Sequence, residues 1–136
     1  MTLPSTTAPA TALVSIMYIE DDPDIQSIAR LALESIGGFD VTICGSGKEA
    51  LAALNGGNHP DLILLDVMMP EMDGPSTLTA LRKLPGAAKT PTIFMTAKAQ
   101  PHEIASLKSL GALDVIAKPF DPMLLAQLIR KLWSNK

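Results

Sequence analysis

Cysteine is almost missing from this sequence, because Cys44 is the only one among 136 residues. No disulfide bond or thiolate metal site can form within such a chain, which is typical of proteins of the reducing cytoplasm, and we expect that location. The formal net charge is −3 and no basic run is longer than Arg82-Lys83, so nucleic acid is disfavoured and we expect no DNA partner. No apolar stretch approaches the roughly 18 residues of a membrane span, so we expect no membrane partner.

The amino-terminal dozen residues differ from the rest in composition, being rich in Thr, Ala, Pro and Ser. They lack the basic start and continuous apolar core of a signal peptide. We expect residues 1–12 to form a disordered tail and residues 13–136 to form one domain, since that length is enough to bury a core. The predicted elements use up the chain, so no output domain is expected after them.

Apolar runs of strand length alternate with helical patterns five times along residues 13–136. The best-marked run, residues 62–65, is continuously apolar, as in parallel strands buried on both faces. Strands that alternate with helices form βαβ units, whose right-handed crossovers place helices on both faces of one sheet. The sequence therefore predicts an α/β fold with a doubly wound, five-stranded parallel sheet. The predicted strands are residues 16–19, 41–44, 62–65, 93–95 and 115–117, and only Thr42 in the second interrupts the apolar residues.

Three pairs of residues predict where helices begin. Asp22-Pro23 and Asp121-Pro122 each combine an N-cap with proline at the first helical position, where a missing N–H costs nothing. Ser46 and Glu49 have the spacing of a capping box. The first helix should end at Gly37-Gly38 and bury an apolar stripe. The residues of that stripe are Ile25, Ile28, Ala29, Ala32 and Ile36.

Polar residues follow four of the apolar runs, and Asp66 is the most informative of them. Open α/β sheets place their chemistry at the carboxyl edge, where the ends of parallel strands meet. Glu20-Asp21, Thr96 and Lys118 end three other runs and should therefore lie near Asp66. Two acids, a hydroxyl and an ammonium around a further acid suit a carboxylate that accepts a phosphoryl group with the help of Mg²⁺.

Over residues 13–133 the chain resembles a response regulator receiver domain (CheY-like), as in a single-domain, stand-alone response regulator. The resemblance implies a flavodoxin-like sheet with strand order 2-1-3-4-5 and five helices. It also implies a cis bond between Lys118 and Pro119. The motifs that carry the resemblance are Glu20-Asp21, Asp66-x-x-Met69-Pro70-x-Met72-Asp73-Gly74, Thr96-Ala97 and Lys118-Pro119-Phe120.

The same resemblance implies a role for each residue of the site. Asp66 is the expected phosphoacceptor, while Thr96 and Lys118 are expected to contact the phosphoryl group. Mg²⁺, with Mn²⁺ as a substitute, is expected to bind Asp21, Asp66 and the backbone carbonyl of Met68. Glu20 is longer than the aspartate of many relatives and should hold a metal-bound water. Ala97 is small, which leaves the acceptor open to a donor molecule.

The function implied is that of a phospho-accepting receiver in a two-component or phosphorelay system. A sensor histidine kinase or a histidine phosphotransfer protein is the expected phosphodonor. The switched surface, made of the fourth helix, fifth strand and fifth helix, is expected to bind a protein target. We do not expect an enzyme in the usual sense, since the only activities implied are its own phosphorylation and autodephosphorylation.

Three positions bear on the lifetime of the phosphorylated form and on its output. The approach of the hydrolytic water is flanked by the residues two beyond Asp66 and Thr96, which are Met68 and Lys98. Methionine cannot orient that water by hydrogen bonding, and lysine has donors but no acceptor. We therefore expect a long-lived phosphorylated form. Val115 stands where relatives have an aromatic ring that swings inward, so the usual aromatic coupling is not expected.

Several other interpretations stay open at this point. The chain is compatible with a phosphorelay shuttle or phosphate sink without switched output, and with a receiver domain cut from a hybrid histidine kinase. Residues 45–50 match a dinucleotide fingerprint, but that interpretation leaves Thr96 and Lys118 without a role. An aspartate-nucleophile phosphatase would need an acid two residues after Asp66, where Met68 stands.

Overall fold

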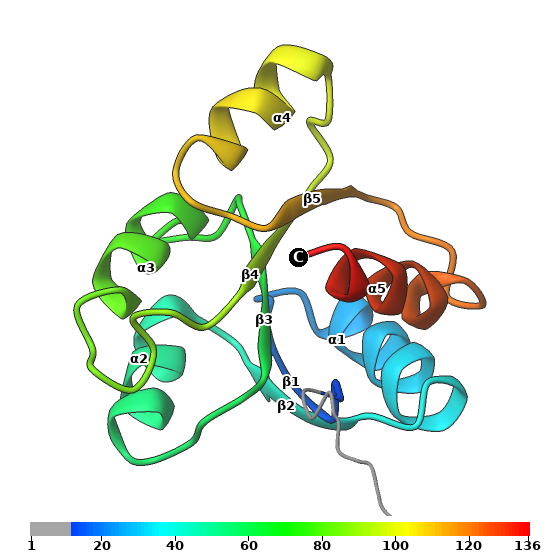
Figure 1. Ribbon diagram of the computed structural model, residues 1–136, viewed down its shortest axis with the longest axis horizontal. Helices are drawn as coiled ribbons and strands as arrows, with labels where there is room; N and C mark the ends of the chain where they lie inside the picture. Colours follow the sequence, from blue (N-terminus) through cyan, green and yellow to red (C-terminus); the bar gives the residue numbers. More distant parts are fainter. Residues whose placement is uncertain (1–11) are drawn as a thin grey trace, which may run out of the picture.

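The computed structural model describes residues 12–136. The tail expected over residues 1–12 therefore lies outside the described residues, except for residue 12. Five strands form one sheet in the order β2-β1-β3-β4-β5, and every neighbouring pair is parallel (Figure 1). This confirms the predicted flavodoxin-like, doubly wound sheet. The strands are β1 (Ser15–Ile19), β2 (Asp40–Cys44), β3 (Leu62–Asp66), β4 (Thr92–Thr96) and β5 (Asp114–Ala117).

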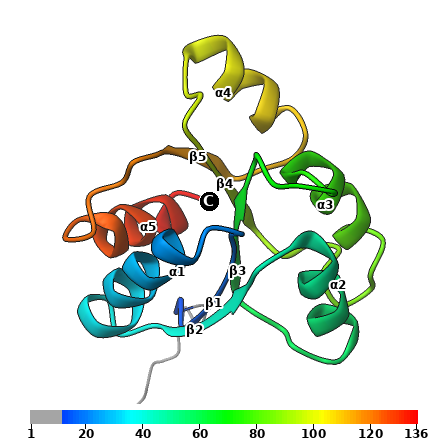
Figure 2. The ribbon, with the colours of Figure 1, turned by 180° about the vertical axis from the view of Figure 1, so that it is seen from behind.

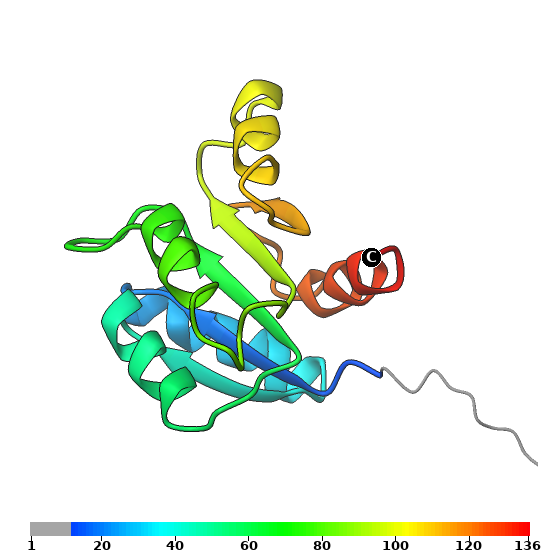
Figure 3. The ribbon, with the colours of Figure 1, turned by 60° about the vertical axis from the view of Figure 1, so that its left-hand side comes forward.

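Helices cover both faces of the sheet (Figures 1 and 2). On one face lie α1 (Pro23–Arg30), its continuation η1 (Leu31–Ile36) and α5 (Leu125–Ser134), while α2 (Gly47–Asn55) and α3 (Gly74–Leu81) lie on the other. Helix α4 (Pro101–Lys108) stands beside β5 at the sheet edge, and none of its residues is buried (Figure 3). Within residues 12–136 we find no helix that is both long and apolar enough to cross a membrane.

The helix starts follow the sequence in two cases and depart from it in a third. Asp22 caps α1 by accepting from the amides of Asp24 and Ile25, as predicted. Ser46 accepts from the amide of Glu49, but the Glu49 carboxylate accepts from Gly45, one residue before the cap. The predicted start at Asp121-Pro122 is wrong, because α5 begins at Leu125. Asp121 instead caps a preceding turn, where its carboxylate accepts from the amide of Met123.

The predicted stripe of the first helix is correct only in part. Ala29 and Ala32 are fully buried, whereas Ile28 and Ile36 are 43% and 42% exposed. Residues 31–36 wind as a π-helix, in which the amide of Gly37 donates to the carbonyl of Ala32 five residues earlier. Leu33, four residues after Ala29, is also buried, whereas Ile36 at the end of the π-helical segment is not.

Candidate functional site

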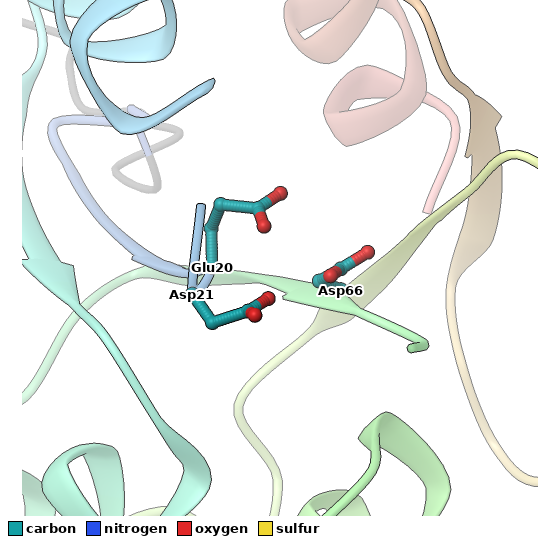
Figure 4. A group of neighbouring side chains, drawn as sticks. All are labelled: Glu20, Asp21 and Asp66. Carbon is teal, nitrogen blue, oxygen red and sulfur yellow. The ribbon is translucent and has the colours of Figure 1, made fainter. Parts of the chain in front are cut away.

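The carboxylates of Glu20, Asp21 and Asp66 meet at the carboxyl edge of the sheet, and we call this group the acidic pocket. Asp66 is the last residue of β3, and the two other acids directly follow β1, the strand paired with β3. One oxygen from each carboxylate lies within 4.8 Å of the others. Figure 4 shows Glu20 and Asp21 leaving the strand end in opposite directions, with Asp66 beside both. Glu20 and Asp66 are buried, at 1% and 2% exposed.

Lys118 closes the acidic pocket from the end of β5. Its Nζ donates to Asp66 Oδ1 at 2.8 Å and to Glu20 Oε1 at 3.1 Å. Burial alone would lower the pKa of Lys118, but the hydrogen bonds to Asp66 and Glu20 outweigh burial and raise that pKa. The ammonium therefore stays charged and offsets the negative charge of two buried carboxylates. The Lys118-Pro119 bond is cis, as the resemblance implied.

Glu20 has more partners than its place in the sequence indicates. Oε1 accepts from the Tyr18 hydroxyl at 3.3 Å in addition to Lys118, and Oε2 accepts from the amide of Asp22 at 3.1 Å. Gln26 in α1 donates to the carbonyl of Glu20 and so ties the strand end to the helix. Burial is the main cause that raises the pKa of Glu20, against the lowering effect of the Asp22 amide. The carboxylate is held in one place by donors from three sides.

Thr96 and Ala97 end β4, the strand next to β3. The register pairs Asp66 with Met95, so Thr96 lies one residue further along the same edge. The Thr96 side chain is buried, and its Oγ1 accepts from the amide of Lys98 at 3.0 Å. Ala97 is exposed and lines an apolar pocket together with Lys118. Both residues thus lie at the edge where the sequence places them, and their contact with a phosphoryl group stays a prediction.

The loop after β3 carries Met68, whose side chain is 65% exposed. Met68, Thr96 and Lys98 line one groove beside the strand ends. Gly74 closes the loop by donating to the carbonyl of Val67 at 2.8 Å. A Cβ at Gly74 would lie 2.6 Å from the carbonyl oxygen of Asp66, so only glycine permits this close approach. The two residues expected to flank the water path therefore share a groove.

Val115 lies outside this group, on the edge strand β5. It is half-buried, pairs in register with Phe94 and packs against the core on the side of α2 and α3. Its short branched side chain has few rotamers. The structure therefore places the expected switch position in the core layer next to α4, away from the acidic pocket.

The donor set of the acidic pocket fits a hard divalent cation. Mg²⁺ prefers oxygen ligands, keeps several waters and needs only one or two carboxylates from the protein. Asp21 is the most exposed of the three acids and reaches solvent, whereas Glu20 is already engaged by Lys118 and Tyr18. The acidic pocket therefore offers the oxygen ligands that such an ion needs.

Comparison with known proteins decides the family. The sequence profile of the response regulator receiver domain matches residues 16–130. This chain belongs to the response regulator receiver family. The receiver domain is similar, at 36% identity over 120 residues, to a 14.6 kDa protein of Leptolyngbya boryana described as uncharacterized, covering 88% of this chain and 90% of that protein.

Two better described proteins are also similar to this receiver domain. The response regulator SaeR of Staphylococcus aureus is 34% identical over 120 residues, which cover 88% of this chain and 50% of SaeR. The receiver domain thus spans about half the length of that relative. The chemotaxis response regulator CheY4 of Vibrio cholerae superposes with a TM-score of 0.80 at 26% identity, covering 89% of this chain and 99% of CheY4. The predicted CheY-like fold and two-component signalling class are therefore correct.

Proposed function

We propose that Asp66 accepts a phosphoryl group from the phosphohistidine of a sensor histidine kinase or a histidine phosphotransfer protein. The observation that carries this proposal is the contact of Lys118 Nζ with Asp66 Oδ1 inside a pocket of three acids. A carboxylate oxygen of Asp66 attacks phosphorus in line with the P–N bond and forms the new P–O bond. The electron pair of the broken P–N bond stays on the donor nitrogen, and the donor leaves as neutral imidazole because its other ring nitrogen carries a proton.

Positioning and charge neutralisation are what the receiver must supply for this transfer. Lys118 already contacts Asp66, so its ammonium can donate a hydrogen bond to an oxygen of the incoming phosphoryl group. Asp21, Asp66 and the Met68 carbonyl would hold Mg²⁺ or Mn²⁺, with Glu20 bound through a water. When bound, the ion neutralises charge on the phosphoryl oxygens. Thr96 offers a hydroxyl, and the small Ala97 leaves room for the donor protein.

The output we propose is a change on the face formed by α4, β5 and α5. The Thr96 hydroxyl, on moving toward a phosphoryl group, would give up its bond from the Lys98 amide, which lies in the loop entering α4. Helix α4 has no buried residue, so few contacts oppose its movement. Apolar side chains exposed on this face suit a protein target in the cytoplasm. They include Leu110, Leu124 and Leu128.

Intact-mass measurement after incubation with acetyl phosphate and Mg²⁺ tests the acceptor without a kinase. We expect one added phosphoryl group on the wild type and none on Asp66→Asn. Asp24→Asn, an exposed acid in the first turn of α1, is the matched control and should be labelled like the wild type. Labelling of Asp66→Asn under the same conditions would contradict the proposal.

One observation favours a second function, that of a phosphorelay shuttle. Val115 carries no aromatic ring, so this position has no side chain of the kind that swings inward in relatives. A purified histidine phosphotransfer protein separates the two functions. Rapid return of the group from phospho-Asp66 to that protein supports the shuttle, and a slow return together with a stable phosphorylated receiver supports the switched output.

A further inference from the structure

Tyr18 carries a hydroxyl within the otherwise apolar run of residues 16–19. It is the next-to-last residue of β1, is 0% exposed, and packs in the core layer beneath α1 and α5. A buried hydroxyl without a partner is costly, so a tyrosine at such a place normally has a hydrogen-bond partner. The partner here is Glu20 Oε1 in the acidic pocket, at 3.3 Å.

The strand itself explains why Tyr18 and Glu20 meet. Side chains two residues apart on a strand point to the same face, so Tyr18 lies directly below Glu20 on the α1 and α5 side. The next acid, Asp21, points to the other side of the strand end (Figure 4). The Tyr18 hydroxyl and Lys118 Nζ both donate to the same oxygen of Glu20. Tyr18 thus limits how far this carboxylate can turn.

We propose that Tyr18 is a positioning residue that orients Glu20 for its part in binding the divalent cation of the receiver. The inference rests on the proposed function, because it assumes that the acidic pocket takes Mg²⁺. A hydrogen-bond partner that fixes a metal-binding carboxylate raises the affinity for the ion, because an ordered carboxylate loses less conformational freedom when the ion binds. Burial raises the pKa of the Tyr18 hydroxyl, so the phenol keeps its proton and remains a donor.

Equilibrium binding of Mg²⁺ to the unphosphorylated receiver, measured by calorimetry, tests this role directly. We expect Tyr18→Phe to raise the Kd for Mg²⁺ about fivefold, below the roughly 10-fold or larger losses seen when the direct partner of a metal ligand is removed. Thr92→Val is the matched control. It also removes a buried strand hydroxyl, which donates to the carbonyl of Thr90 at the opposite edge of the sheet. Its Kd should equal that of the wild type.

A double-mutant cycle with Glu20→Gln separates positioning from a general effect on the fold. If Tyr18 acts through Glu20, Tyr18→Phe should not weaken Mg²⁺ binding further in the Glu20→Gln background. An equal Kd for Tyr18→Phe and the wild type would overturn the proposal, as would a full fivefold effect that persists without Glu20. Absence of Mg²⁺ binding by the wild type would instead refute the metal site of the proposed function.

A spectroscopic measurement keeps the test independent of any variant. Tyr18 is the only tyrosine in the chain, so labelling the ring carbon that bears the hydroxyl gives one NMR signal. We expect that signal to shift as Mg²⁺ saturates the pocket, because the charge on its acceptor Glu20 becomes shared with the ion. A signal that does not move at saturating Mg²⁺ would overturn the proposal even if Tyr18→Phe failed to fold.

Discussion

Replacing Lys118 by methionine should destabilise the metal-free receiver by much more than the loss of an ordinary surface ion pair. The ammonium contacts two carboxylates whose side chains are 1% and 3% exposed. Without it, Glu20 and Asp66 are two like charges in a buried pocket. Removing one partner of a buried ion pair costs about 3–5 kcal/mol. Protonation of one acid relieves part of this cost, so we expect a loss of about 3 kcal/mol near neutral pH.

Thermal unfolding in a chelating buffer measures the loss. For a domain of this length, about 3 °C of Tm corresponds to 1 kcal/mol, so Lys118→Met should lower Tm by about 10 °C. Lys108→Met is the matched control, because Lys108 and Asp114 form an exposed pair at 4.0 Å that should contribute less than about 0.5 kcal/mol. Mg²⁺ should restore more stability to Lys118→Met than it adds to the wild type, since it brings positive charge to the same carboxylates.

The pH dependence of the same variant has a definite sign. Burial raises the pKa of Glu20, and Lys118 lowers it. Without Lys118, the pKa of Glu20 in the folded state should therefore rise further above the ordinary 4.5. A raised carboxyl pKa contributes stability that is fully present below 4.5 and is lost as pH rises through the folded-state pKa. The deficit of Lys118→Met should therefore shrink as pH falls. A deficit no larger than that of Lys108→Met, or one that Mg²⁺ does not reduce, would refute the reasoning.

Three further predictions follow from the groove, the loop and the first helix. Met68→Asn should speed dephosphorylation about tenfold, because one added hydrogen bond to the attacking water lowers the barrier by about 1.4 kcal/mol. Met123 is an equally exposed methionine, so Met123→Asn should leave the rate of dephosphorylation unchanged. If phosphorylated Met68→Asn decays no faster than the wild type, this water path is ruled out. Amide exchange with and without a phosphoryl mimic should change most in residues 97–110 and little at Val115, whereas changes confined to the surroundings of Asp66 would favour the shuttle. Asp22→Ala should lower the free energy of unfolding by about 1 kcal/mol, because it removes the cap of α1, and acetyl phosphate should still phosphorylate the variant. Urea unfolding measures the change in free energy, and an unchanged value would contradict the capping role of Asp22.

Much of the fold could be predicted because short segments of the sequence indicate their own secondary structure. Mostly apolar segments predicted the five parallel strands, and Asp22 as an N-cap predicted the start of α1, both correctly. Local patterns were misleading where the chain winds differently. Residues 31–36 wind as a π-helix, and Asp121, four residues before the start of α5, caps a turn instead of the helix. Neither effect is visible in the spacing of apolar residues.

The site could be predicted to the level of which strand ends meet, but not to the level of side-chain direction. The carboxyl ends of parallel strands meet at one edge, and four polar residues at these ends lie close together in the structure as predicted: Glu20, Asp21, Asp66 and Lys118. The part played by Tyr18 was missed, because a tyrosine in an apolar run is read as core. The signal that could have found it is alternation: Tyr18 and Glu20 share one face of β1 and both need a polar partner once buried.

Identification of the modified carboxylate is the measurement that tests the central claim most directly. Borohydride reduces an aspartyl phosphate to homoserine, which peptide mass spectrometry can locate after labelling with acetyl phosphate and Mg²⁺. We expect homoserine at position 66 alone, in an amount that falls when Mg²⁺ is chelated. Homoserine at Asp21, or labelling of a residue outside the acidic pocket with Asp66 intact, would contradict it.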